Sequence, residues 1–62
     1  MNIQDLRKEN AMTQEDLAAA LNVTQGTVSL WETKKNRPNV KNLALLAKLF
    51  RVDISELIEE FV

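Results

Sequence analysis

The chain has 62 residues and a net charge of −1, which fits one small domain near the lower size limit for independent folding. It contains no cysteine and no histidine, which excludes disulfides, thiolate metal sites and the nucleophile–base pairs of many hydrolases. No apolar run approaches the ~20 residues of a membrane span, and the first residues show no signal peptide. We therefore expect a soluble, non-enzymatic protein without a cofactor, a metal or a small-molecule ligand.

Charged side chains are distributed unevenly along the chain. Residues 1–32 contain two basic and five acidic side chains, residues 33–51 six basic and no acidic ones, and residues 52–62 four acidic and no basic ones. Because local potential rather than total charge governs docking onto a polyanion, the basic block favours nucleic-acid binding over the alternative of a solvated loop. The last block includes three carboxylates interpreted as a solvated helix face rather than a metal site: Glu56, Glu59 and Glu60.

Five short helices are predicted, at residues 3–9, 14–21, 25–32, 40–50 and 54–61. Each follows a residue whose side-chain oxygen can accept a hydrogen bond from the first turn, namely Asn2, Thr13, Thr24, Asn39 and Asp53. Asp16 lies three residues after Thr13, as in a capping box, and Asn22 suits a left-handed helix end. Glu56 stands in the same relation to Asp53. No strand is expected, because no run of β-branched residues alternates.

Apolar residues recur on one side of each predicted helix and define the expected core. This set comprises Ile3, Leu6, Leu17, Ala18, Leu21, Val23, Val28, Trp31, Leu43, Leu46, Ala47, Phe50, Ile54, Leu57 and Phe61. Trp31 shares a helix face with Val28, so its ring is expected in the core rather than on the surface as a stacking platform.

Residues 13–33, TQEDLAAALNVTQGTVSLWET, form the most informative stretch of the chain. They predict two capped helices joined by a short turn, an arrangement in which the second helix protrudes from the body. Its outer face carries Gly26, Ser29 and Leu30, with Gln25 and Thr27 on the flanks. A protruding helix with small, uncharged side chains fits the major groove of DNA.

Over nearly its whole length the chain resembles the helix-turn-helix domain of the Xre family, the lambda-repressor-like group that includes phage repressors and Cro-type proteins. The resemblance runs without a gap through Leu6-Arg7, Thr13-Gln14, Leu17-Ala18, Val23-Thr24, Val28-Ser29, Trp31-Glu32, Pro38, Leu46-Ala47 and Val52. The expected fold is therefore all-α, a compact five-helix lambda-repressor-like DNA-binding domain. Residues 1–62 are expected to form one complete domain, with the helix-turn-helix at the second and third helices.

The resemblance implies roles for the matching residues. The base-contacting positions would be Gln25, Gly26, Ser29 and Leu30. The phosphate-contacting positions would be Gln14, Thr24, Thr27, Lys34, Lys35, Asn36 and Arg37. Gln14 would also brace Gln25, whose amide can donate to N7 and accept from N6 of an adenine. Arg7 and Glu32 resemble a family pair that ties the first helix to the end of the third.

Three features depart from the family pattern. Ala11, Asn22 and Lys34 stand where the family often has glycine, and of these only Asn22 tolerates a positive φ easily. Gly26 allows close approach to DNA but forfeits one side-chain contact. Leu30 replaces a residue that is more often polar or basic, and it could meet thymine methyl groups.

Four apolar residues exceed what one inward face can use: Leu45, Leu49, Ile58 and Val62. Exposed apolar clusters on a small domain usually mark a contact surface, and operators of the resembled family are commonly palindromic. We therefore expect a homodimer, at least on DNA, which would place two reading helices about one turn apart. The alternative is a monomer whose five helices bury these residues.

These observations predict a sequence-specific DNA-binding transcriptional regulator of the bacterial cytoplasm or nucleoid, a repressor of the phage or prophage Cro type. Two alternatives remain at this stage. One is a protein-interaction module that kept the fold and lost DNA binding, which the acidic total, Gly26 and Leu30 would fit. The other is the antitoxin of a toxin–antitoxin pair, which would still bind its own operator.

Overall fold

The computed structural model describes residues 2–61 and contains the five predicted helices in chain order: α1 (Ile3–Glu9), α2 (Gln14–Leu21), α3 (Gln25–Glu32), α4 (Val40–Phe50) and α5 (Ile54–Glu60). α5 ends one residue earlier than predicted, because Phe61 is its C-cap. The described residues contain no strand, as expected.

Polar caps begin every helix, and all five predicted N-cap residues accept a hydrogen bond from the first turn. The capping box of α2 is complete: the Asp16 N–H donates to Thr13 Oγ1 at 3.0 Å, and the Thr13 N–H donates to Asp16 Oδ2 at 2.9 Å. The predicted second box is wrong. Asp53 Oδ1 accepts from both the N–H and the hydroxyl of Ser55, each at 2.9 Å, so Ser55 rather than Glu56 satisfies this short side chain.

The turns keep a left-handed backbone even where glycine is absent. Asn22 has φ 58°, as predicted, and the same region holds Ala11 at 54° and Lys34 at 63°. Arg51, at 57°, ends α4 in the same way. A side chain with a Cβ adopts this conformation at a cost of roughly 1–2 kcal/mol, so the surrounding helices impose these turns against local preference.

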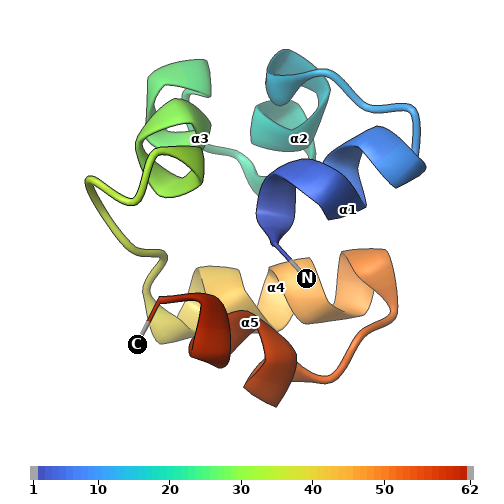
Figure 1. Cartoon of the computed structure of the whole chain (residues 1–62). Coiled ribbons are helices and arrows are strands. Elements are labelled where there is room, and N and C mark those ends of the chain that lie inside the picture. Colours follow the sequence, from blue (N-terminus) through green and yellow to red (C-terminus); the bar gives the residue numbers. More distant parts are fainter. Residues whose placement is uncertain (1, 62) are drawn as a thin grey trace.

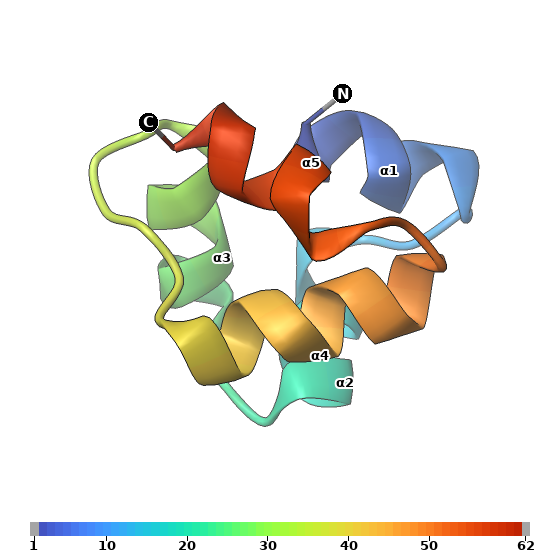
Figure 2. The ribbon, with the colours of Figure 1, turned by 90° about the horizontal axis from the view of Figure 1, so that it is seen from below.

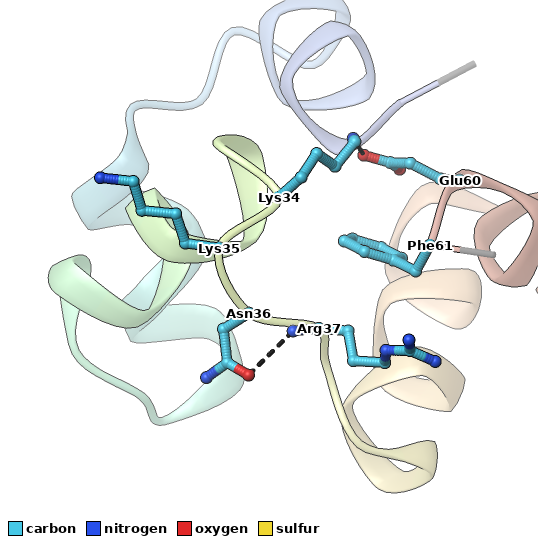
Figure 3. Close-up of a pocket in the computed structure, with 6 residues that line it drawn as sticks. All are labelled: Lys34, Lys35, Asn36, Arg37, Glu60 and Phe61. Atoms are coloured by element: carbon cyan, nitrogen blue, oxygen red, sulfur yellow. Dashed lines mark hydrogen bonds and ion pairs between the residues drawn. The ribbon is translucent and has the colours of Figure 1, made fainter.

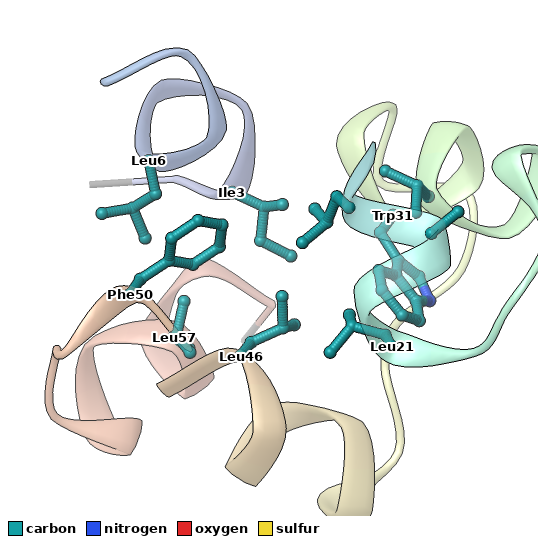
Figure 4. Close-up of a cluster of buried hydrophobic side chains, with 10 residues drawn as sticks. Ile3, Leu6, Leu21, Trp31, Leu46, Phe50 and Leu57 are labelled. Carbon is teal, nitrogen blue, oxygen red and sulfur yellow. The ribbon is translucent and has the colours of Figure 1, made fainter. Parts of the chain in front are cut away.

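The helices form two packed pairs around one core. α2 packs against α3 and α4 packs against α5, while α4 also contacts α2 and α1 contacts α3 (Figures 1 and 2). Among residues 2–61, ten apolar side chains are buried: Ile3, Leu6, Leu17, Ala18, Leu21, Val28, Trp31, Leu46, Phe50 and Leu57. Trp31 is 2% exposed and lies inside this cluster, which confirms its assignment to the core (Figure 4). Leu43, Ala47, Val23 and Phe61 are half-buried at its edge.

A buried ion pair joins the beginning of the chain to the end of α3. The Arg7 guanidinium donates from Nε to Glu32 Oε2 at 2.7 Å and from Nη2 to Oε1 at 3.2 Å. Its Nη1 donates to the Met12 carbonyl at 2.8 Å, which also fixes the α1–α2 turn. The two side chains are only 10% and 4% exposed. The pair predicted from the sequence is therefore present and well shielded from water.

Protonation of Glu32 is linked to this pair. Partial burial opposes ionisation of its carboxyl group, but hydrogen bonds from Arg7 and Gln14 outweigh that effect and lower the pKa of Glu32. The hydrogen bond to Glu32 raises the pKa of Arg7, against the effect of burial. Among residues 2–61, every buried side-chain nitrogen and oxygen atom has a hydrogen-bond partner.

The substitution Glu32→Gln tests the strength of this constraint. It leaves the Arg7 charge buried without a counterion, so we expect a loss of about 3–5 kcal/mol in the free energy of unfolding, measured by urea titration. Glu9→Gln, which neutralises an exposed carboxylate at the end of α1, is the control and should change stability by less than about 0.5 kcal/mol. An unchanged urea midpoint for Glu32→Gln would show that water screens the pair.

The same variant carries a pH signature. Because the folded pKa of Glu32 lies below the unfolded value of about 4.3, its contribution is complete above that value and disappears as the pH falls through the folded pKa. Asp16 and Asp53 also have lowered pKa values, through hydrogen bonds from Thr13 and Ser55. Those two remain in the variant, so the stability difference from wild type should shrink below about pH 4 through Glu32 alone.

Candidate nucleic-acid interface

The outer face of α3 is the candidate reading surface. Val28 and Trp31 are buried in the core, so the opposite side of α3 faces outward. On that side Gln25 and Gly26 are exposed, Leu30 is 41% exposed and Ser29 is half-buried. The residues predicted to contact bases therefore lie on one accessible face, where Gly26 and Ser29 add little side-chain volume.

A relay of hydrogen bonds connects this face to the buried ion pair. Gln14 Nε2 donates to Glu32 Oε1 at 3.0 Å, and Gln25 Nε2 donates to Gln14 Oε1 over a longer 3.4 Å. An ionised carboxylate only accepts, so Glu32 forces the Gln14 amide to present its oxygen to Gln25. The second Nε2 hydrogen and the carbonyl oxygen of Gln25 are then left for a ligand at the surface.

The fold does not require glycine at position 26. Gly26 has no positive φ, and a Cβ added there would come no closer than 3.9 Å to a neighbour, the Thr24 hydroxyl oxygen. A glycine in the middle of a helix costs about 0.5–1 kcal/mol relative to alanine, and this is the upper limit for Gly26, the second residue of α3. The free protein has no steric need for glycine at position 26. Gly26 therefore suits a surface that a binding partner approaches closely.

The first turn of α3 also presents two hydroxyl groups. Thr24 Oγ1 accepts from the Thr27 N–H at 3.2 Å as the cap of the helix, and the two threonine hydroxyls lie 2.9 Å apart. Capping therefore fixes the position of both side chains beside Gln25.

The loop after α3 carries the basic residues, and its backbone is ordered by short-range bonds. The Lys35 N–H donates to the Leu30 carbonyl at 3.0 Å, and the Arg37 N–H donates to Asn36 Oδ1 at 2.9 Å. Pro38 is buried and anchors the far end of the loop. The residues predicted to contact phosphate here are all exposed: Lys34, Lys35, Asn36 and Arg37.

A hollow of about 420 Å³ lies between this loop and the end of α5, where the structure shows a contact that the sequence analysis missed (Figure 3). The Lys34 ammonium forms an ion pair with Glu60 and lies 5.1 Å from the centroid of the Phe61 ring. Glu60 Oε1 also accepts from the Ile3 N–H at 2.9 Å.

The predicted solvated face of three carboxylates is therefore wrong for one member. Glu56 and Glu59 are exposed, but the Glu60 side chain is only 4% exposed. Glu60 is buried because α5 folds back, so that its end contacts both the start of α1 and the basic loop. The opposite charges of the blocks 33–51 and 52–62 were the available signal for this contact.

The predicted dimer residues on α4 and α5 are accessible. Leu45 and Leu49 are each 39% exposed, and Ile58 is 44% exposed. Val62, the fourth, lies outside the described residues.

In residues 2–61 no helix combines the length and apolar composition that crossing a membrane requires.

The sequence of the chain is similar to those of known helix-turn-helix proteins. The helix-turn-helix family profile matches residues 3–57. The HTH-type transcriptional activator BcrR of Enterococcus faecalis is 41% identical over 56 residues, which cover 90% of this chain and 28% of the activator. The cryptic phage CTXphi transcriptional repressor RstR of Vibrio cholerae is 33% identical over 58 residues, which cover 94% of this chain and 52% of the repressor.

This chain spans only part of the length of both relatives, and in both cases the shared part includes α3 and the basic loop. No solved structure shows significant similarity to the chain. The family match extends over α1 to α4 and into α5, so it covers all the elements that position the interface. The chain belongs to the Xre-type helix-turn-helix family of DNA-binding transcription regulators.

Proposed function

We propose that the protein is a repressor that binds a palindromic operator as a homodimer, with α3 of each copy in the major groove. The relay from Arg7 through Glu32 and Gln14 to Gln25 carries this proposal, because it orients an exposed amide from a rigid, buried anchor. Occupation of promoter DNA is sufficient for repression, and the exposed face of α3 beside a basic loop supports this proposal.

Sequence reading is assigned to four residues on α3. Gln25 donates to N7 and accepts from N6 of an adenine with the two groups that the relay leaves available. Gly26 lets the helix approach the groove floor, Ser29 offers a hydroxyl, and Leu30 meets a thymine methyl group. The bidentate amide and the methyl contact distinguish base pairs, whereas the other two adapt to the groove.

Affinity and register are assigned to the groups around this face. The hydroxyls of Thr24 and Thr27, the amide of Gln14, and the loop residues Lys35, Asn36 and Arg37 bind phosphate oxygens on either side of the groove. Such contacts fix the position of the protein on the duplex and carry no direct sequence information. The net negative charge of the whole chain is compatible with this function, because the cations are concentrated beside α3.

Gln25→Ala tests base reading. We expect a loss of about 1–3 kcal/mol in operator binding and a relaxed preference at one position per half-site, measured by selection of bound sites from a random duplex library. Glu15→Ala, an exposed change on α2, is the control and should preserve the selected motif. Equal weakening on all sequences would make Gln25 a backbone ligand instead.

Gly26→Ala separates folding from recognition. The added methyl group has room in the free protein and improves helix propensity, so the free energy of unfolding should rise by up to about 1 kcal/mol. Operator affinity should fall at the same time, because the methyl group keeps α3 from the groove floor. Melting curves and fluorescence anisotropy on one protein preparation measure both quantities. Unchanged affinity would remove Gly26 from the interface.

The homodimer is assigned to α4 and α5. Three large apolar side chains, Leu45, Leu49 and Ile58, each keep about two fifths of their surface exposed, and two of them lie one turn apart on α4. Burying them against a second copy would stabilise a two-fold dimer. A palindromic operator presents two half-sites related by the same symmetry.

Leu45→Glu combined with Leu49→Lys tests this interface without DNA. Sedimentation equilibrium should show a dimer for the wild type at high micromolar concentration and a monomer for the double variant. Leu30→Gln is the matched control, since Leu30 is similarly exposed but lies on α3, and it should leave the association unchanged. A dimer that survives the double substitution places the interface elsewhere.

A further inference from the structure

The end of α5 lies against the loop that we assign to phosphate binding. Figure 3 shows the Lys34 side chain directed toward Glu60, whereas Lys35 leaves the loop in another direction. Lys34 has a left-handed backbone, φ 63°, so the chain changes direction between these two residues. Adjacent cations in the sequence therefore have different surroundings, and only Lys34 faces a carboxylate among the contacts described.

The Glu60 carboxylate is held ready for this contact. One oxygen accepts from the Ile3 N–H at 2.9 Å in the first turn of α1, and the other pairs with the Lys34 ammonium. The Glu60 side chain is 4% exposed, so water competes weakly for its carboxylate, whereas the Lys34 side chain is 47% exposed. The Phe61 ring, 5.1 Å from the ammonium, adds a cation–π contact to the same position.

This arrangement changes the charge that the loop offers to DNA. A lysine that binds a phosphate contributes to affinity by releasing a counterion from the duplex. Lys34 would first have to leave Glu60, exchanging one anion for another and leaving a shielded carboxylate without its partner. The net charge of the Lys34–Glu60 pair is zero, so Lys35 and Arg37 supply the loop charge that acts on phosphate.

We propose that Glu60 is a positioning residue that withholds Lys34 from the DNA backbone and thereby sets operator affinity below the level that three loop cations would give. The proposal rests on the function proposed above, because it takes the loop as a phosphate-binding segment. Glu60 acts through Lys34 and touches neither bases nor phosphates.

Glu60→Gln is the direct test, measured as the dependence of log K on log salt concentration. The glutamine oxygen still accepts from the Ile3 N–H, while Lys34 becomes free to bind phosphate. We expect the slope to steepen by about 0.9 for each bound chain and the affinity to rise about five- to tenfold at 0.1 M monovalent salt. Glu59→Gln removes the same charge from an exposed neighbour and should produce a much smaller change.

The double variant Lys34→Gln with Glu60→Gln makes the test specific. It removes the pair without changing the net charge, so its slope should match the wild type. A slope shallower by about one would mean that Lys34 already binds phosphate in the wild type, and it would overturn the proposal. So would an effect of Glu60→Gln no larger than that of Glu59→Gln.

A further variant distinguishes failure of this inference from failure of the proposed DNA-binding function. Lys35→Gln should make the slope shallower than that of the wild type by about one, and an unchanged slope would instead remove the loop from the interface.

A measurement on the wild-type protein does not depend on any variant folding. Trace acetylation followed by mass spectrometry reports the reactivity of each lysine with and without operator DNA. Bound DNA should lower the reactivity of Lys35 and leave that of Lys34 at its value in the free protein, and an equal decrease for both lysines would contradict the role of Glu60.

Discussion

The buried Arg7–Glu32 pair is the interaction on which the rest of the structure depends. It joins α1 to the end of α3, satisfies the Met12 carbonyl in the α1–α2 turn and, through Gln14, orients the Gln25 amide at the start of α3. A buried ion pair is a weak source of net stability but has strict geometric demands. Here those demands set the direction in which Gln25 faces.

The scaffold that holds this pair is small and made of short parts. Helices of seven to eleven residues are marginal in water, so their existence depends on caps and on the shared core. Each helix has a polar N-cap, and three of the connections force a residue other than glycine or asparagine into a left-handed backbone. The cost of these backbone conformations is offset by burial of the shared core, which includes Trp31.

Electrostatics are arranged at the level of single residues rather than of the whole chain. The protein has a net negative charge but carries a basic loop beside α3. The Glu60 carboxylate forms an ion pair with Lys34 of that loop. An operator-binding protein must still leave DNA, and it must discriminate its site from a large excess of other sequences. In the function proposed above, limiting the phosphate contacts, which are indifferent to sequence, would serve both needs.

The amino-acid sequence by itself determined the five helices, their N-caps, the buried face of each and the helix-turn-helix, because these follow from periodicity and capping within a few residues. It also indicated the Arg7–Glu32 pair, although only by resemblance to the family. The capping role of Ser55 and the burial of Glu60 were decided by the structure. Glu60 meets Ile3 and Lys34 across separations of 57 and 26 residues, and no local pattern reports such distances. Contacts of that kind form only when α5 folds back onto the start of the chain, which is a property of the packed core as a whole.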